Sequence, residues 1–340
     1  MKHITLGKTG ITVPQNAFGA LPIQRVDLQT AVSLLRGAYD GGMRFFDTAR
    51  AYTDSEEKVG AAFDGMRDQI FLATKTHAAT PEEFWNDLET SLKNLRTDYV
   101  DIYQFHCAKR CYRPGDGTGM YEAMLEAKRL GKIRHIGITA HLIGVAEEVA
   151  ESGLYETLQF PFSYLASERD LALVKKCADA KIGFIAMKGL SGGLLNNAAA
   201  CMAFMSQYEV LPIWGIQRQE ELAQWLSFFD HMPDLTDELK TIIEEDRRSL
   251  AGDFCRGCGY CAPCTVGIVI NQCARMSQMV RRAPTQSWTS PHWQEEMNKI
   301  DDCIECGVCM SRCPYELDIP NLLKKNLADY RAILAHEIKV

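Results

Sequence analysis

The chain has 340 residues, of which 46% are hydrophobic and 24% charged, and its formal net charge at pH 7 is −7. This acidic balance argues against nucleic acid as a partner, because a nucleic-acid binder needs a basic surface. The composition is that of an ordinary globular protein, long enough to hold a second domain. The sequence contains no run of about 20 apolar residues, so we expect no membrane contact and a cytoplasmic location.

From Phe45 to Trp214, short apolar or β-branched runs alternate with longer segments of helical period. This alternation is typical of βα units that share a parallel sheet. With one earlier run, eight strands are predicted, at residues 16–21, 45–48, 70–74, 100–105, 133–139, 158–160, 183–187 and 211–214. Eight such units predict a closed (β/α)8 barrel of about 250 residues. The alternative is an open doubly wound sheet, which is disfavoured because no G-x-G-x-x-G turn follows an early strand.

The pattern changes after Ser249, where a charged helical stretch gives way to a cysteine-rich segment. We place a domain boundary there. The predicted barrel covers residues 1–250, and a small second domain with a C-terminal helix covers residues 251–340.

Eight of the 13 cysteines lie in two short runs. The runs are Cys255, Cys258, Cys261 and Cys264, and then Cys303, Cys306, Cys309 and Cys313. Thiols two residues apart in a cytoplasmic protein indicate metal ligands and not disulfides. The second run, which ends in Cys313-Pro314, has the spacing of bacterial ferredoxins that bind [4Fe–4S] clusters. The first run is one residue shorter and has Thr265 where the proline is expected.

Tetrahedral zinc is the alternative ligand, because it is also bound by paired C-x2-C units. Zinc does not explain a third cysteine at the same interval or the Cys-Pro ending, so we predict a ferredoxin-like domain with two [4Fe–4S] clusters. The ferredoxin arrangement would give Cys313 to the first three cysteines and Cys264 to the other three. The domain contains few long apolar runs, so we expect a thin core that folds around the clusters.

Polar residues at the carboxyl ends of barrel strands are candidates for an active site. Asp47, Lys75 and His106 lie at the ends of the second, third and fourth predicted strands, and Tyr52 lies in the loop after the second. Each of the four by itself has a structural explanation. Together they predict a proton donor, because a nearby ammonium lowers the pKa of a phenol from about 10 and a carboxylate orients the ammonium. The imidazole would position a substrate carbonyl.

Three segments, DTARAYTDSE at 47–56, ATK at 73–75 and DYVDIYQFH at 98–106, resemble the aldo-keto reductase family, in particular its branch with an appended ferredoxin-like domain. The resemblance implies the barrel fold, the catalytic tetrad Asp47, Tyr52, Lys75 and His106, and NADPH bound without a Rossmann motif. The implied activity is reduction of an aldehyde or ketone, or oxidation of the alcohol, with Tyr52 as proton donor.

The resemblance also implies a set of cofactor-binding positions. They are Thr139, Gln159, Met187, Lys188, Gly192, Gly215 and Arg218. Gln159 matches the family, whereas Ala140 stands where the family has the asparagine that binds the nicotinamide carboxamide. Arg218 would bind the adenosine phosphate, and a solvated helix face is the alternative for it.

The cysteine runs leave a second function open, because a nicotinamide transfers two electrons as hydride and a cluster transfers one. The alternative is an iron–sulfur electron-transfer protein whose barrel binds nucleotide or docks a redox partner protein. The complete tetrad favours the enzyme, whose substrate would be a small carbonyl or alcohol molecule. The clusters are then either structural or serve an electron partner. Cys107 and Cys111 lie next to His106, and their spacing does not favour a redox or ligand role over two loop thiols.

Overall fold

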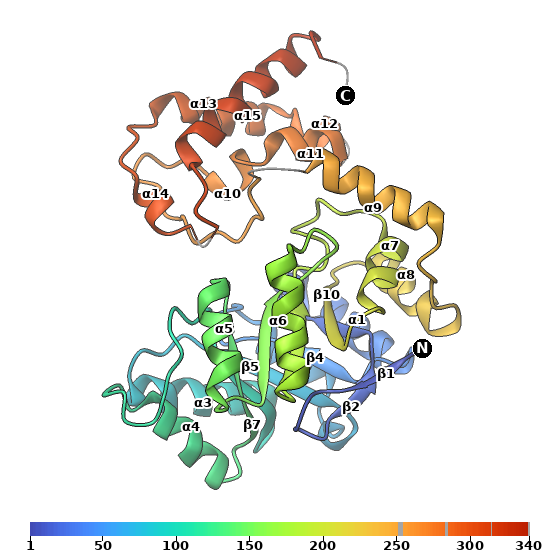
Figure 1. Cartoon of the computed structure of the whole chain (residues 1–340), viewed down its shortest axis with the longest axis vertical. Helices are drawn as coiled ribbons and strands as arrows, with labels where there is room; N and C mark the ends of the chain where they lie inside the picture. Colours follow the sequence, from blue (N-terminus) through green and yellow to red (C-terminus); the bar gives the residue numbers. More distant parts are fainter. Residues whose placement is uncertain (251–253, 283–284, 314, 339–340) are drawn as a thin grey trace. The chain divides into compact units, whose positions relative to one another are not determined.

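The computed structural model describes residues 1–250, 254–282, 285–313 and 315–338 (Figure 1). Pro314 and the predicted junction at 251–253 therefore lie outside the described residues. The chain divides into a first unit, Met1–Gly189 with Ala198–Leu239, and a second unit, Leu190–Asn197 with Lys240–Val340. The division falls within helix α9 (Asp237–Ser249), and the boundary near residue 250 stays a prediction.

The first unit contains a closed barrel of eight parallel strands. The strands are β3 (Ala17–Gly19), β4 (Phe45–Asp47), β5 (Phe71–Thr76), β6 (Val100–Phe105), β7 (Ile133–Thr139), β8 (Thr157–Pro161), β9 (Gly183–Met187) and β10 (Val210–Gly215). They pair in chain order, and β10 closes the barrel by pairing with β3. The predicted (β/α)8 barrel is thereby confirmed.

A helix follows each barrel strand. These helices are α1 (Leu28–Asp40), α2 (Ser55–Ala62), α3 (Pro81–Leu95), α4 (Met120–Arg129), α5 (Ile143–Ser152), α6 (Glu168–Asp179), α7 (Ala198–Met205) and α8 (Gln219–Asp230). Two 3-10 helices, η1 (Pro22–Arg25) and η2 (Arg67–Gln69), lie in the loops. Helix α1 buries Ala31, Leu34, Leu35 and Ala38, one apolar face of the helical period.

An antiparallel hairpin precedes the barrel and was not predicted. Its strands are β1 (His3–Thr5) and β2 (Thr12–Pro14), and the turn between them uses positive φ angles at Gly7 and Gly10. Four of its apolar side chains pack with residues from the amino-terminal parts of the barrel strands: Ile4, Leu6, Ile11 and Val13. The hairpin closes this end of the barrel, which leaves the carboxyl end for a site.

The second unit is helical. After α9 it contains α10 (Ile270–Cys273), α11 (Met276–Arg282), α12 (Thr285–Trp288), α13 (Pro291–Asn298), η3 (Lys299–Asp302), α14 (Val308–Ser311) and α15 (Ile319–Leu334). Helix α15 buries Leu323, Leu327 and Tyr330, and the Tyr330 hydroxyl donates a hydrogen bond to the Trp288 carbonyl (2.8 Å). The core is larger than predicted, because α15 contributes six buried residues and several short segments that are separate in sequence pack against it. The described helices include none whose length and apolar content would suit a membrane span.

The packing of α2 against the end of α3 gives a stability test. A Cβ atom at Gly60 would overlap the Asn94 carbonyl oxygen and approach the Leu95 backbone within 3 Å. Gly60→Ala should therefore destabilise the barrel by about 1–3 kcal/mol or more, as overpacking does. Thermal unfolding followed by circular dichroism measures the loss.

Gly144→Ala is the matched control, because Gly144 is exposed in α5 and an added Cβ there would meet nothing within 4 Å. The higher helix propensity of alanine should leave this variant as stable as the parent or more stable by up to ~1 kcal/mol. Equal melting temperatures for the two variants would contradict the packing described for α2.

Candidate functional site

Three neighbouring strands present the predicted tetrad at one rim of the barrel. Asp47 ends β4, Lys75 is the penultimate residue of β5, and His106 directly follows β6. Tyr52 lies in the loop between β4 and α2, which is fixed to β5 by a hydrogen bond from the Arg50 amide to the Lys75 carbonyl (3.0 Å). The parallel register therefore brings the four side chains to one end of the barrel.

Lys75 and Asp47 form a buried ion pair. The Lys75 Nζ lies 2.7 Å from Asp47 Oδ2 and also donates to the Thr48 carbonyl (2.6 Å). The two side chains are 0% and 3% exposed. Burial raises the pKa of Asp47, and the ammonium opposes this rise. The pair holds the ammonium in one position at the rim.

Tyr52 lies close to both this pair and His106. The Lys75 Nζ is 5.1 Å from the centroid of the Tyr52 ring, and the Tyr52 and His106 rings meet edge to face at 5.6 Å. Burial, followed by the negative charges of Asp47 and Cys107, raises the pKa of Tyr52 well above 10. The net pKa of Tyr52 in the chain alone is therefore raised and not lowered as predicted, because desolvation of the phenol is the largest effect. The phenol is protonated at neutral pH.

His106 is a neutral imidazole in this environment. Burial lowers its pKa well below 6.5, and the positive charge of Lys75 and the neighbouring His77 and His141 rings lower it further. Its Nδ1 is buried and has no hydrogen-bond partner among the described residues. A neutral ring can donate one hydrogen bond to a substrate carbonyl.

Two buried polar side chains support the tetrad and were missed in the sequence. Gln104, on β6, donates to Gln159 Oε1 (3.0 Å) and lies 3.4 Å from Asp47 Oδ1. Glu56, on α2, accepts hydrogen bonds from Arg50 and from the Thr74 hydroxyl, each at 2.7 Å. A glutamine within the predicted strand 100–105 was a signal of a buried polar group. Glu56 gave no such signal, because a glutamate in a helix is ordinarily exposed.

The predicted cofactor residues of the barrel unit differ in what they contact. Thr139 Oγ1 accepts the Cys107 amide (2.7 Å), and Gln159 is bound to Gln104. Met187 ends β9 and is followed by Lys188 at φ +57°. Thr139, Gln159 and Met187 therefore lie at the same end of the barrel as the tetrad.

The other three predicted cofactor positions are placed differently. Gly215 is the exposed last residue of β10. The guanidinium of Arg218 is paired with Glu221 (2.7 Å), so an anion would have to compete with a carboxylate. Gly192 belongs to the second unit, where its carbonyl accepts a hydrogen bond from Arg275 Nη1 (2.7 Å).

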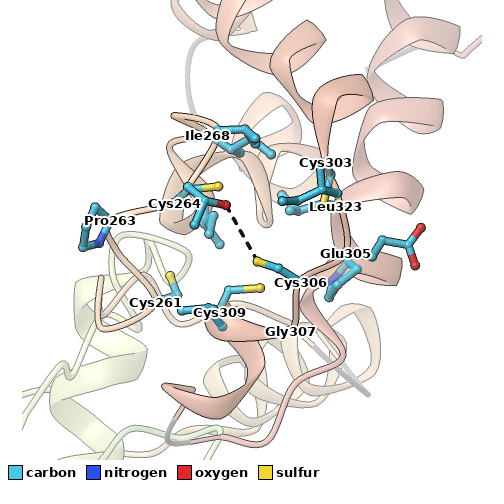
Figure 2. Close-up of a pocket in the computed structure, with 16 residues that line it drawn as sticks. Cys261, Pro263, Cys264, Ile268, Cys303, Glu305, Cys306, Gly307, Cys309 and Leu323 are labelled. Atoms are coloured by element: carbon cyan, nitrogen blue, oxygen red, sulfur yellow. Dashed lines mark hydrogen bonds between the residues drawn. The ribbon is translucent and has the colours of Figure 1, made fainter.

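The eight clustered cysteines line two hollows of the second unit. One hollow is lined by Cys255, Cys258, Cys261 and Cys313. The other is lined by Cys264, Cys303, Cys306 and Cys309 together with Cys261, and Figure 2 shows several of these sulfurs directed inward. Cys261 lines both hollows, and the other seven cysteines are divided between them in the way that the ferredoxin arrangement predicts.

The chemistry of these hollows suits iron–sulfur clusters. Apart from the sulfurs, apolar side chains such as Ile270, Leu317 and Leu323 form much of the lining. Gly259 and Gly307 have positive φ angles within the two runs, so the backbone turns there. Burial raises the pKa of Cys261 to about 12, so a bound metal would be needed to keep this sulfur as a thiolate.

The fold and the thiol sets define a class of protein, a (β/α)8 barrel joined to an iron–sulfur unit. The family model described as "Aldo/keto reductase family" matches residues 15–203. A second model, "4Fe-4S dicluster domain", matches residues 254–318. The chain belongs to the aldo/keto reductase family and carries a C-terminal 4Fe-4S domain.

Known relatives agree with this assignment. Aldo-keto reductase YhdN of Bacillus subtilis is 32% identical over 216 residues, which are 58% of this chain and 64% of YhdN. The chain thus matches slightly less than two thirds of that relative. In fold it is similar to aldo-keto reductase AKR11C1 of Bacillus halodurans in its holo form (TM-score 0.63, 21% identity, 72% of this chain and 96% of that one).

This chain is likewise similar in fold to a Klebsiella pneumoniae aldo-keto reductase in complex with NADPH (TM-score 0.60, 24% identity, 72% of this chain and 95% of that one).

The buried ion pair gives the second test. Lys75→Met leaves the Asp47 carboxylate buried without its cation, which typically costs about 3–5 kcal/mol. Without the ammonium, burial raises the pKa of Asp47 unopposed, so the stability deficit should grow as the pH rises above the ordinary carboxyl range near 3.8. Chemical denaturation at several pH values measures it.

The control is Arg96→Met, which breaks the exposed pair with Asp64 (53% and 61% exposed). Exposed pairs contribute about 0–1 kcal/mol, so this variant should stay close to the parent at every pH. A Lys75→Met loss as small as that of the control would show that the ion pair does not stabilise the barrel.

Proposed function

We propose that this protein is an NADPH-dependent reductase of a small aldehyde or ketone, which also oxidises the corresponding alcohol. The observation that supports the proposal is the juxtaposition of a protonated, half-buried Tyr52 with the buried Asp47–Lys75 ion pair and a neutral His106 at one rim. A protein that only docks a partner has no need to bury these groups together. The family membership and the similarity in fold to an NADPH complex agree with it.

Each residue of the tetrad has a separate task in the proposed mechanism. Bound NADPH would supply a hydride to the carbonyl carbon. Tyr52 donates its phenolic proton to the carbonyl oxygen, and Lys75 stabilises the phenolate that remains. Asp47 keeps Lys75 charged and in place, and His106 orients the carbonyl oxygen by a hydrogen bond. For alcohol oxidation the same residues act in reverse.

The nicotinamide cofactor would be bound by the residues that follow the later strands. We assign this role to the residues of the barrel unit, Thr139, Gln159, Met187, Lys188, Gly215 and Arg218. Arg218 can contact a phosphate of the cofactor only when its guanidinium exchanges Glu221 for that phosphate. Ala140 supplies no side-chain hydrogen bond, so Thr139 and Gln159 are the polar groups available for the carboxamide.

The second unit is proposed to bind two [4Fe–4S] clusters, one in each hollow. One would be held by Cys255, Cys258, Cys261 and Cys313, and the other by Cys303, Cys306, Cys309 and Cys264. These two ferredoxin-like sets favour a second candidate function, the transfer of single electrons to a redox partner protein. Reduction of the clusters by a chemical reductant, without NADPH, followed by electron paramagnetic resonance, tests that candidate.

Tyr52→Phe tests the proton donor. Without the hydroxyl, turnover of NADPH-linked carbonyl reduction should fall by about 10²- to 10⁴-fold. NADPH affinity, measured by fluorescence titration, should remain similar. Tyr99→Phe, which keeps the ring that stacks with Arg67 and Arg134, is the control and should retain full turnover. Full turnover in Tyr52→Phe would exclude the proposed role.

Iron and sulfide analysis tests the clusters. Anaerobically purified protein should contain about eight of each per chain, two sets of four. Cys264→Ser and Cys313→Ser should each lose about four irons, because each removes one ligand from a different hollow. Cys273→Ala is the control, since this thiol is buried in the same unit outside both hollows. Zinc in place of iron, or no loss in either serine variant, would reject the assignment.

A further inference from the structure

Three side chains of metal-binding types lie together at the barrel rim, and one of them belongs to the tetrad. They are His77, His106 and Cys107, whose ligating atoms all lie within 4.8 Å of one another. His77 and Cys107 have no part in the mechanism proposed above. A nearby pair of imidazoles and a thiol is a set of donors that zinc binds in proteins.

The backbone holds these three residues in register. His77 follows β5, and His106 and Cys107 follow the adjacent strand β6. The His106 amide donates to the Thr76 carbonyl (2.8 Å), and the Cys107 amide donates to Thr139 Oγ1 (2.7 Å). Cys107 also has a positive φ of 53°. The loop geometry is therefore determined by neighbouring strands on both sides of β6.

The side chains need only small movements to share one ion. The His77 and His106 rings are stacked, with centroids 4.1 Å apart and planes inclined by 25°. Zinc bonds of about 2.0–2.1 Å to nitrogen and 2.3 Å to sulfur place tetrahedral ligand atoms about 3.3–3.6 Å apart. His77 is exposed and can rotate to shorten the remaining distance.

We propose that His77, His106 and Cys107 form a binding site for a divalent cation of the zinc type, and that the bound cation inhibits carbonyl reduction. The two imidazoles and the deprotonated thiol provide three ligands and leave the fourth position to water. Binding releases the thiol proton to solvent and changes no oxidation state.

The charges around the site permit a cation. The positive charge of Lys75 acts on both histidines, but its ammonium is paired with Asp47 at 2.7 Å. The Asp87 carboxylate acts on His77 with the opposite sign. The Cys107 thiolate supplies one further negative charge. Because Lys75 is paired with Asp47, it repels a cation bound by the three side chains less than an unpaired lysine would.

Inhibition follows from the position of His106. A metal-bound imidazole no longer presents that nitrogen to a substrate carbonyl, and the His106 ring is only 5.6 Å from the Tyr52 ring. This step rests on the proposed reductase function. The binding of the cation does not rest on it, so the two are measured separately.

Zinc binding is measured on the full-length protein with its clusters assembled. The anaerobic protein is equilibrated by dialysis against Zn²⁺, and zinc and iron are then counted by mass spectrometry. The wild type should bind one zinc per chain that His77→Gln and Cys107→Ser do not bind, with unchanged iron. Loss of a ligand should raise the zinc dissociation constant by more than the ~10- to 100-fold caused by loss of an outer-shell partner.

Two control variants separate this site from other donors. Cys111→Ser changes a nearby loop thiol, and His231→Gln changes a histidine outside the trio. Both should bind zinc as the wild type does. Equal zinc binding by all four variants would overturn the proposal, as would zinc uptake that displaces an equivalent amount of iron.

Enzyme assays test the inhibition. Zn²⁺ should raise the apparent KM for the carbonyl in the wild type, a chelator should reverse the effect, and His77→Gln should resist it at least about 10-fold better. Zinc bound by the trio without any change in KM would overturn the inhibitory role. If no carbonyl is reduced even without zinc, the reductase function fails, and the zinc count still decides whether the site exists.

Discussion

Closure of the barrel between β3 and β10 is the constraint on which the rest of the structure depends. The register pairs Trp214 with Phe18 and Gly215 with Gly19. A Cβ at Gly19 would lie 3.2 Å from the Trp214 carbonyl oxygen, so the close approach of these strands favours glycine. Once the sheet is closed, all strand ends meet at one rim, and residues 28 positions apart such as Asp47 and Lys75 form a buried pair.

Burial acts on the rim residues in ways that suit proton donation. It keeps Tyr52 protonated and His106 neutral, because removal from water disfavours the charged form of each. It would also favour a protonated Asp47, but the adjacent ammonium opposes that effect. A charged Lys75 is thereby available to stabilise the phenolate formed when Tyr52 gives up its proton. One physical effect, desolvation, thus prepares two of the groups, and one ion pair prepares the others.

In the second unit the cysteines belong both to the predicted ligand sets and to the hydrophobic core. Cys255 and Cys261 pack among the buried residues that surround helix α15, whereas Cys306 is exposed. The two hollows therefore differ in their access to water. A cluster held by the exposed cysteine would be the more accessible one for an external electron donor or acceptor, and the more buried set would contribute more to the core.

The sequence by itself determined the barrel, because strand period and helical period are local patterns. The cysteine intervals are local too and indicated the thiol sets, and the resemblance of three segments to a known family selected the tetrad. The hairpin β1–β2 and the extensive core of the second unit were decided by tertiary structure, since both depend on short apolar segments that acquire meaning only when distant residues pack on them. The same holds for the pKa of Tyr52, which burial raises, and for Arg218, whose guanidinium is paired with Glu221. His77 and Cys107 lie 30 residues apart in the chain, and only the pairing of β5 with β6 brings them within reach of one ion.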